Sequence, residues 1–220
     1  MNILTLGATG NTGQHFVKFA LERGHKVRAL VRSSAVLDKR PGLEVVKGDV
    51  LDPAALAQAA RGMEAIVCCL GIRKQDPADP WSLLLSPEDF MERCAIGIVD
   101  AMKASGLQRV VVISSAGVGD SWGSVDPDLR HVIQSSSVGK IFRDLGNMES
   151  VLEASGLDTL AVRPVALVSG DTSGTARIVD TFEKTSRISY ANVALWMLNA
   201  VEKASLFEQQ TEMIGGGQGA

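Results

Sequence analysis

The chain has 220 residues, of which 45% are hydrophobic and 21% are charged, and its formal net charge is −3. This length and composition suit a single globular domain over residues 1–220 with a sizeable core. No basic tract favours nucleic acid or an anionic membrane as a partner, and no apolar run approaches the ~18 residues needed to cross a bilayer.

The amino terminus and the cysteines indicate the compartment. The stretch MNILTLGATG lacks the charged region of a signal peptide, and Cys68 and Cys69 lie side by side in an apolar run. These features predict a cytoplasmic protein whose cysteines are reduced core residues. The three histidines are scattered along the chain, so no metal site is expected.

Apolar, β-branched runs recur along the chain and alternate with amphipathic stretches. They predict strands at 2–7, 26–31, 43–47, 65–70, 109–114 and 158–163, with a short last strand near 211–216. The helices between them are expected to end at four glycines, Gly24, Gly62, Gly106 and Gly156. Asp52 and Ser86, each followed by proline, predict two helix N-caps. The alternation predicts an α/β fold, a doubly wound parallel sheet of the Rossmann type in three layers, αβα.

The first predicted strand runs into GATGNTG at residues 7–13. Gly7 allows a tight turn, Gly10 lets a pyrophosphate approach the backbone, and Gly13 lets helix and strand pack closely. The N-terminus of the following helix favours an anion. Further hydrogen bonds are expected from the polar side chains of Thr9, Asn11 and Thr12. This glycine pattern between a first strand and a first helix predicts a dinucleotide-binding loop.

The residue after the second strand indicates which dinucleotide binds. An NAD site usually carries Asp or Glu there, whereas this chain carries Arg32, whose guanidinium suits a 2′-phosphate. NADP(H) is therefore the predicted cofactor, and a solvated surface arginine is the alternative. The loops after later strands should line the same crevice. They contribute Asp49 and Val50 near the adenine, Leu70 and Gly71 at the backbone, Ser114, and Pro164 and Val165 beside the nicotinamide.

The ordered motifs GATGNTG, VRSS, GDVLDP, VVVISSAG and SGLDTLAVRP resemble the atypical branch of the short-chain dehydrogenase/reductase superfamily. The chain resembles its NmrA-like proteins and its compact reductases of the biliverdin reductase B and flavin reductase type. The resemblance implies an NADP-binding Rossmann fold with Ser115 at the active-site serine position. It also implies a helix-to-strand signature at Glu149, Arg163 and Pro164.

The superfamily's Tyr-x-x-x-Lys pair is missing, because Ile141 and Leu145 stand at its positions. That pair is the general acid/base of alcohol–carbonyl interconversion, whereas a planar conjugated acceptor can accept hydride directly. The predicted function is therefore an NADPH-dependent oxidoreductase acting on a small-molecule flavin, quinone or tetrapyrrole-like acceptor. A non-catalytic NADP(H)-binding redox sensor of the NmrA-like type is the alternative, and an isomerase or epimerase is a weaker one.

The substrate side is expected from residues 116–136 and 165–205. The first segment is interpreted as a long loop in which Trp122 either stacks on a flat ligand or packs the loop down. The only tyrosine, Tyr190, is interpreted as a half-buried residue at a helix start. The chain is expected to be a monomer or a homodimer.

Overall fold

The computed structural model describes residues 1–220 except 33, 35–36, 171–174 and 217–220. Eight of its described strands form one sheet in the order β3-β2-β1-β4-β5-β6-β10-β8. Their bounds are β1 Asn2–Leu6, β2 Lys26–Val31, β3 Leu43–Lys47, β4 Ala65–Cys68, β5 Arg109–Ile113, β6 Asp158–Pro164, β8 Ala176–Ile178 and β10 Thr211–Gly216. Neighbours pair in parallel except β8, which is antiparallel to β10 at the edge. The predicted doubly wound sheet is confirmed.

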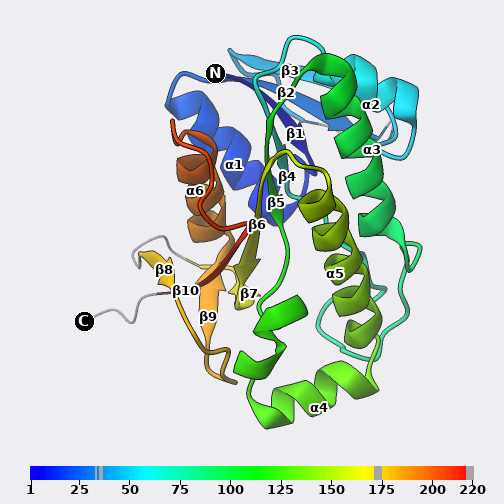
Figure 1. Cartoon of the computed structure of the whole chain (residues 1–220), viewed down its shortest axis with the longest axis vertical. Helices are drawn as coiled ribbons and strands as arrows, with labels where there is room; N and C mark the ends of the chain where they lie inside the picture. The colour runs from blue at the N-terminus through cyan, green and yellow to red at the C-terminus, as the bar shows by residue number, and fades with distance from the viewer. Residues whose placement is uncertain (33, 35–36, 171–174, 217–220) are drawn as a thin grey trace.

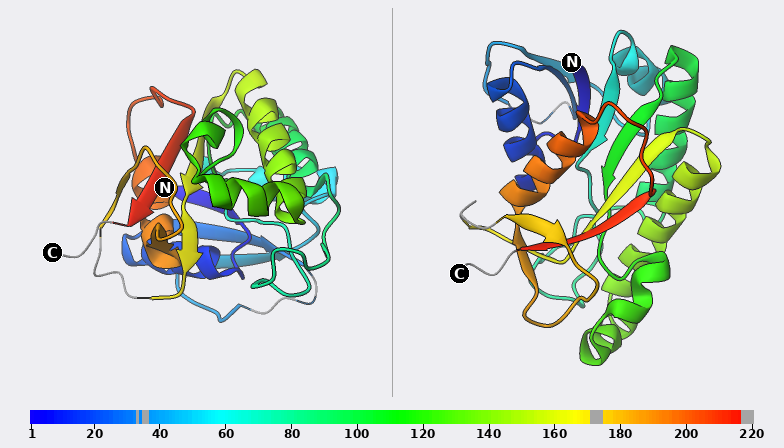
Figure 2. Two further views of the ribbon diagram at one scale, coloured as in Figure 1. Left: turned by 90° about the horizontal axis from the view of Figure 1, so that it is seen from below. Right: turned by 60° about the vertical axis from the view of Figure 1, so that its left-hand side comes forward.

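Helices cover both faces of this sheet. The helices α1 (Asn11–Glu22) and α6 (Tyr190–Val201) lie together on one face (Figure 1). On the other face lie α2 (Pro53–Ala60), α3 (Phe90–Ser105) and α5 (Val138–Ala154) (Figures 1 and 2). A buried apolar cluster lies under each group of helices. The expected three layers are present because the strands, apolar on both faces, need cover on both sides.

The helix ends follow the sequence signals with one exception. The four predicted glycines adopt positive φ, as a left-handed helix end requires. Asp52 accepts the Ala54 N–H at 2.9 Å and caps α2. The prediction of Ser86 as an N-cap is wrong, because α3 begins at Phe90 and Ser86 Oγ accepts the Arg73 N–H instead.

The first N–H groups of α3 are satisfied from another helix. The carboxylate of Asp144 on α5, 1% exposed, accepts the Met91 and Glu92 N–H groups at 2.8 and 2.9 Å. Burial raises the pKa of this carboxyl, while the two backbone hydrogen bonds act against that rise. A cap supplied from a distant helix leaves no local signal in the sequence.

The interpretation of residues 116–136 as a long loop is wrong. The segment forms a short 3-10 helix, η1 (Gly119–Ser124), and the helix α4 (Pro127–Ser135). The Asp126 carboxylate accepts the N–H groups of Asp128 and Leu129, and Pro127 follows it. Trp122 packs against the buried core cluster, which agrees with the second of its two predicted roles, packing this segment onto the domain.

The second expected substrate-side segment, 165–205, leaves the main sheet. Its strands β7 (Ala166–Val168) and β9 (Arg187–Ser189) pair in parallel as a separate ribbon, and α6 follows β9 directly. Among the described helices, none has the length and apolarity that crossing a bilayer requires.

Candidate functional site

The order of the strands places a crevice at the carboxyl ends of β1 and β4. The chain proceeds outward from β1 through β2 to β3 and then returns to β4 on the other side of β1. Ligands of such sheets bind where the order reverses. Gly7, with φ of +78°, lies at this point, and a Cβ there would be 2.7 Å from the Cys69 carbonyl carbon. Only glycine fits this turn.

The other two glycines of the loop have different roles: Gly13 permits close packing, and Gly10 leaves the backbone accessible. A Cβ on Gly13 would lie 2.1 Å from the Gly7 carbonyl oxygen, so Gly13 permits α1 to contact the turn. A Cβ on Gly10 would meet only that oxygen, at 3.4 Å, so the Gly10 backbone is accessible. Gly10 is also the N-cap of α1, and no described side chain caps the helix. Accessible backbone at a helix N-terminus suits a phosphate.

A cleft of about 270 Å³, here called the Arg32 cleft, adjoins this turn. Seven of the predicted site residues line it, namely Gly7, Thr9, Arg32, Asp49, Val50, Leu70 and Gly71. Lining residues that the sequence reading missed include Arg73, Ser86 and Phe90. A Cβ on Gly71 would meet no atom within 4 Å, so this residue borders open space.

The Arg32 cleft carries an excess of positive charge. Arg32 is exposed, and neither its guanidinium nor that of Arg73 pairs with a described side chain. The one carboxylate among the lining residues, Asp49, accepts the Leu51 N–H at 2.9 Å. Two free guanidinium groups beside an accessible helix N-terminus suit a phosphorylated ligand.

A larger cleft of about 670 Å³, here called the Tyr190 cleft, continues from the first. The predicted residues Gly10, Asn11, Thr12, Leu70, Gly71 and Ser114 line it. The two clefts share four residues, Leu70, Gly71, Arg73 and Leu85. The two clefts therefore adjoin along these described residues.

The wall of the Tyr190 cleft comes from distant parts of the chain. Ile141 and Leu145 of α5, Leu167 of β7 and Tyr190 of α6 all line it. No Asp or Glu is among the described lining residues, while Arg73 and Lys74 are. Tyr190 is half-buried at a helix start, as predicted, but its place in this wall was missed. A local sequence pattern does not indicate which distant elements Tyr190 will face in the folded protein.

Four predicted residues do not line either cleft. Gly13 lies beneath the glycine turn, and Ser115 Oγ donates to the Ala116 carbonyl at 3.2 Å. Pro164 and Val165 are buried at and after the end of β6, and Val165 lines a separate pocket. The roles of Ser115, Pro164 and Val165 toward a ligand stay predictions.

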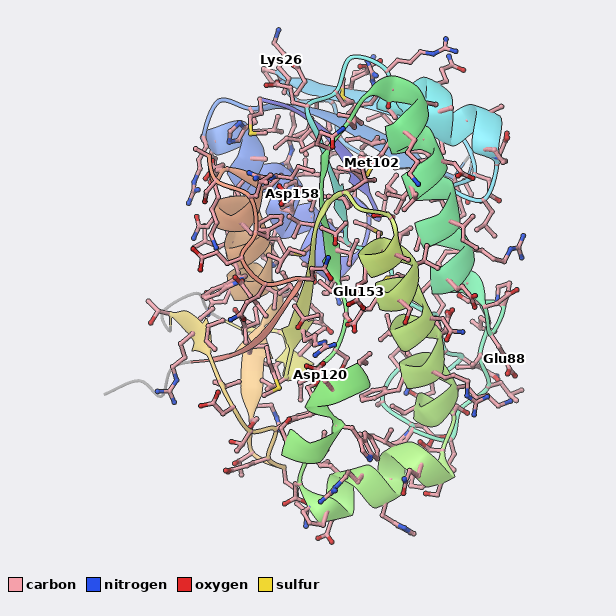
Figure 3. The ribbon with its side chains drawn as sticks, viewed as in Figure 1. Lys26, Glu88, Met102, Asp120, Glu153 and Asp158 are labelled. Carbon is pink, nitrogen blue, oxygen red and sulfur yellow. The ribbon has the colours of Figure 1, made fainter. Side chains whose placement is uncertain are left out.

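A buried ion pair fixes the segment behind the site. Arg163 of β6, whose side chain is 5% exposed, donates to both Glu149 carboxylate oxygens at 3.0 and 2.6 Å. Its third hydrogen bond, at 2.5 Å, goes to Asp120, which Figure 3 labels at the start of η1. The signature expected at Glu149 and Arg163 therefore ties α5, β6 and η1 together, and the hydrogen bond from Arg163 lowers the pKa of Asp120.

The raised pKa values of Cys68 and Cys69 support their interpretation as unreactive, reduced residues. Burial raises the pKa of Cys68 to about 11. Cys69 borders the Tyr190 cleft, and burial raises the pKa of its thiol as well. Thiols held in the protonated form are poor nucleophiles.

The chain resembles known proteins over different fractions of its length. Oxidoreductase aflX of Aspergillus parasiticus is 27% identical over 225 residues, covering 95% of this chain and 79% of that protein. The photosystem II assembly factor Ycf39 of Cyanophora paradoxa is 32% identical over 116 residues. That match covers 52% of this chain and 34% of Ycf39, so the chain spans about a third of that relative.

A solved structure shares the fold. ChuY, described as an anaerobillin reductase from Escherichia coli O157:H7, matches with a TM-score of 0.76 at 22% identity. The match covers 97% of this chain and 96% of that one. Residues 7–204 match the model of a family described as NAD(P)H-binding, and the prediction of a nicotinamide dinucleotide cofactor is confirmed. The chain belongs to this NAD(P)H-binding family of Rossmann-fold proteins.

Proposed function

We propose that the protein is an NADPH-dependent reductase that transfers hydride to a planar conjugated acceptor. The observation that carries this proposal is that the two clefts adjoin at Leu70 and Gly71. A dinucleotide is long enough to lie across such a junction, with its two ends in different surroundings. Both clefts carry cationic side chains, and the Tyr190 cleft is the larger of the two.

The Arg32 cleft would hold the adenosine half. The backbone from Thr9 to Thr12, with the N-terminus of α1, would bind the pyrophosphate. Arg32 would pair with the 2′-phosphate, which distinguishes NADPH from NADH. Asp49 and Val50 would border the adenine, and Pro164 and Val165 would support the nicotinamide.

The Tyr190 cleft would hold the acceptor against the nicotinamide. When bound, NADPH supplies the hydride chemistry itself, and the protein supplies placement and an environment that excludes water. A flat, apolar acceptor would pack against the apolar side chains of Ile141, Leu145 and Leu167. Ser114 and Ser115, at the end of β5, are the candidate hydrogen-bond donors to its polar atom.

The names of two relatives support a reductase. Oxidoreductase aflX matches nearly the whole chain, and the solved structure described as an anaerobillin reductase shares the fold over nearly all of it. Neither name fixes the acceptor of this protein.

The test is hydride transfer with NADPH deuterated at one or the other face of C4. A flavin, a quinone and a linear tetrapyrrole serve as acceptors. We expect NADPH oxidation that depends on the acceptor, with deuterium removed from one face only. A protein that binds NADPH but oxidises it with none of these acceptors would contradict the reductase and favour the redox sensor.

A variant that blocks the junction sharpens this test. Gly71→Val adds a side chain where a Cβ meets no atom within 4 Å, so the fold should tolerate it. Because displacement by about an ångström costs on the order of 100-fold in rate, turnover should fall by about that factor while the unfolding midpoint stays unchanged. Gly123→Ala, equally free of contacts but on η1 outside both clefts, should turn over like the wild type.

A further inference from the structure

Tyr190 combines three features that the proposed function does not use. It is the only tyrosine of the chain and the first residue of α6. It is half-buried in the wall of the Tyr190 cleft. Its phenolic hydroxyl forms no hydrogen bond with any residue that the structure describes. A phenol at a cleft wall usually has a polar partner, and the Tyr190 hydroxyl is open to water or to a ligand in the cleft.

Ser114 offers a second unpaired hydroxyl in the same cleft. The residue is 7% exposed, and its Oγ is buried without a hydrogen-bond partner among the described residues. Leaving such a buried group unpaired destabilises the folded protein. Its backbone N–H donates to the Val162 carbonyl at 2.7 Å, so the end of β5 fixes its position. An orphaned hydroxyl on a rigid strand end indicates a ligand atom that accepts a hydrogen bond.

The other walls make these two hydroxyls effective. Ile113, Ile141, Leu145 and Leu167 are apolar and line the same cleft. Hydrogen bonds to a developing negative charge are stronger in such surroundings than in water. No described carboxylate lines the cleft to compete for these donors. Three described lining residues, Cys69, Lys74 and Tyr190, carry side chains of the general-acid type. Lys74 Nζ donates to the Asp79 carbonyl at 2.9 Å, and burial raises the pKa of the Cys69 thiol. Tyr190 is therefore the donor that no described residue engages.

We infer that Tyr190 is the proton donor of the reaction and that Ser114 donates a hydrogen bond to the same acceptor atom. This inference rests on the proposed hydride transfer and narrows the acceptors to conjugated carbonyl or imine compounds. The acceptor carbon gains the hydride and forms a new C–H bond, while the conjugated π pair moves to the oxygen or nitrogen. That heteroatom takes the Tyr190 proton, NADPH is oxidised to NADP⁺, and the phenolate regains a proton from water.

The kinetic test removes each hydroxyl in turn. Tyr190→Phe should lower kcat with a quinone about 100-fold, within the range of general acid catalysis, while NADPH affinity stays unchanged. Ser114→Ala should lower kcat about tenfold or more, because one preorganised donor is lost. Wild-type turnover in Tyr190→Phe would overturn the inference and leave the proposed reductase standing.

Matched variants control for the fold. Trp196→Phe removes another aromatic donor of α6, which bonds Glu212 at 2.7 Å and lies outside both clefts. Ser150→Ala removes an exposed hydroxyl of α5 that donates to Gly146. Both should keep wild-type turnover. An equal loss in Tyr190→Phe and Trp196→Phe would indicate a structural role and contradict the proton donor.

A spectroscopic test needs no acceptor. Incorporation of meta-fluorotyrosine gives one fluorine resonance, because Tyr190 is the only tyrosine. NADP⁺ should shift this resonance, whereas adenosine 2′,5′-bisphosphate, which carries no nicotinamide, should leave it in place. A resonance that moves with neither ligand, or equally with both, would overturn the inference even where NADPH oxidation occurs. If neither NADP⁺ nor NADPH binds the protein, the proposed function and this inference fail together.

Discussion

The two halves of the crevice are built by different means. The Arg32 cleft lies against a turn of bare backbone, because Gly7 and Gly13 allow strand, turn and helix to approach within contact. Around the Tyr190 cleft, side chains from α5, β7 and α6 make the surface. Among these elements, α5 is tied to β6 by the Arg163–Glu149 ion pair and to α3 by Asp144. The glycine turn on the cofactor side therefore depends on the absence of side chains, and the position of α5 on the acceptor side depends on their presence.

The largest effect is expected from Gly13→Ala. The new Cβ would lie 2.1 Å from the Gly7 carbonyl oxygen, so α1 or the turn must shift. We expect a loss of about 3 kcal/mol or more in the free energy of unfolding, as for severe overpacking, together with weaker NADPH binding. Urea unfolding and a fluorescence titration measure both. Wild-type stability and binding would contradict the account of the turn, and Gly123→Ala is the control.

Arg163→Leu is the corresponding change on the acceptor side. It leaves Glu149, whose side chain is 10% exposed, without its two hydrogen bonds from the guanidinium. Removing one partner of a buried ion pair typically costs about 3–5 kcal/mol, and we expect the lower end here. Urea unfolding checks this value. Replacing both partners, Arg163→Leu with Glu149→Leu, should recover part of the loss; no recovery would contradict the ion-pair explanation.

Asp144→Ala tests the cap between helices. It removes the acceptor of the Met91 and Glu92 N–H groups at the buried start of α3. Loss of a helix cap typically costs about 1–2 kcal/mol, and we expect about 2 because the site is buried. The control is Asp126→Ala, which removes the less buried cap of α4 and should cost less. Equal losses would show that burial adds nothing.

The same carboxylate predicts a pH dependence. Burial raises its pKa in the folded protein above the unfolded value, so the folded state binds the proton more tightly. The stability that this group contributes should therefore fall as the pH rises from the ordinary aspartate pKa to the raised one. The difference in unfolding free energy between wild type and Asp144→Asn should shrink across that window. A difference that grows with pH would contradict the assignment.

The residues of the glycine turn could be predicted from the sequence, whereas several residues of the Tyr190 cleft could not. Gly7, Gly10 and Gly13 follow one another closely, so their spacing reports a backbone shape directly. Arg32 and Leu70 could be predicted because they closely follow strands whose order follows from the β/α alternation. Tyr190, Leu167 and Arg73 were missed because their meeting depends on how distant elements pack. The cap from Asp144 could not be predicted for the same reason. The cap at Asp126-Pro127, in contrast, has a local sequence signal, an aspartate followed by proline.

The most direct test of the account is a titration with NADPH, NADH and NADP⁺ of wild type, Arg32→Ala and Arg61→Ala. Arg61 is an exposed arginine outside both clefts and serves as the control. We predict that the wild type prefers NADPH over NADH and that Arg32→Ala weakens NADPH binding about tenfold or more, as loss of a charge-assisted contact does, with NADH binding unchanged. Arg61→Ala should match the wild type. No binding of any dinucleotide to the wild type would contradict the account of both clefts.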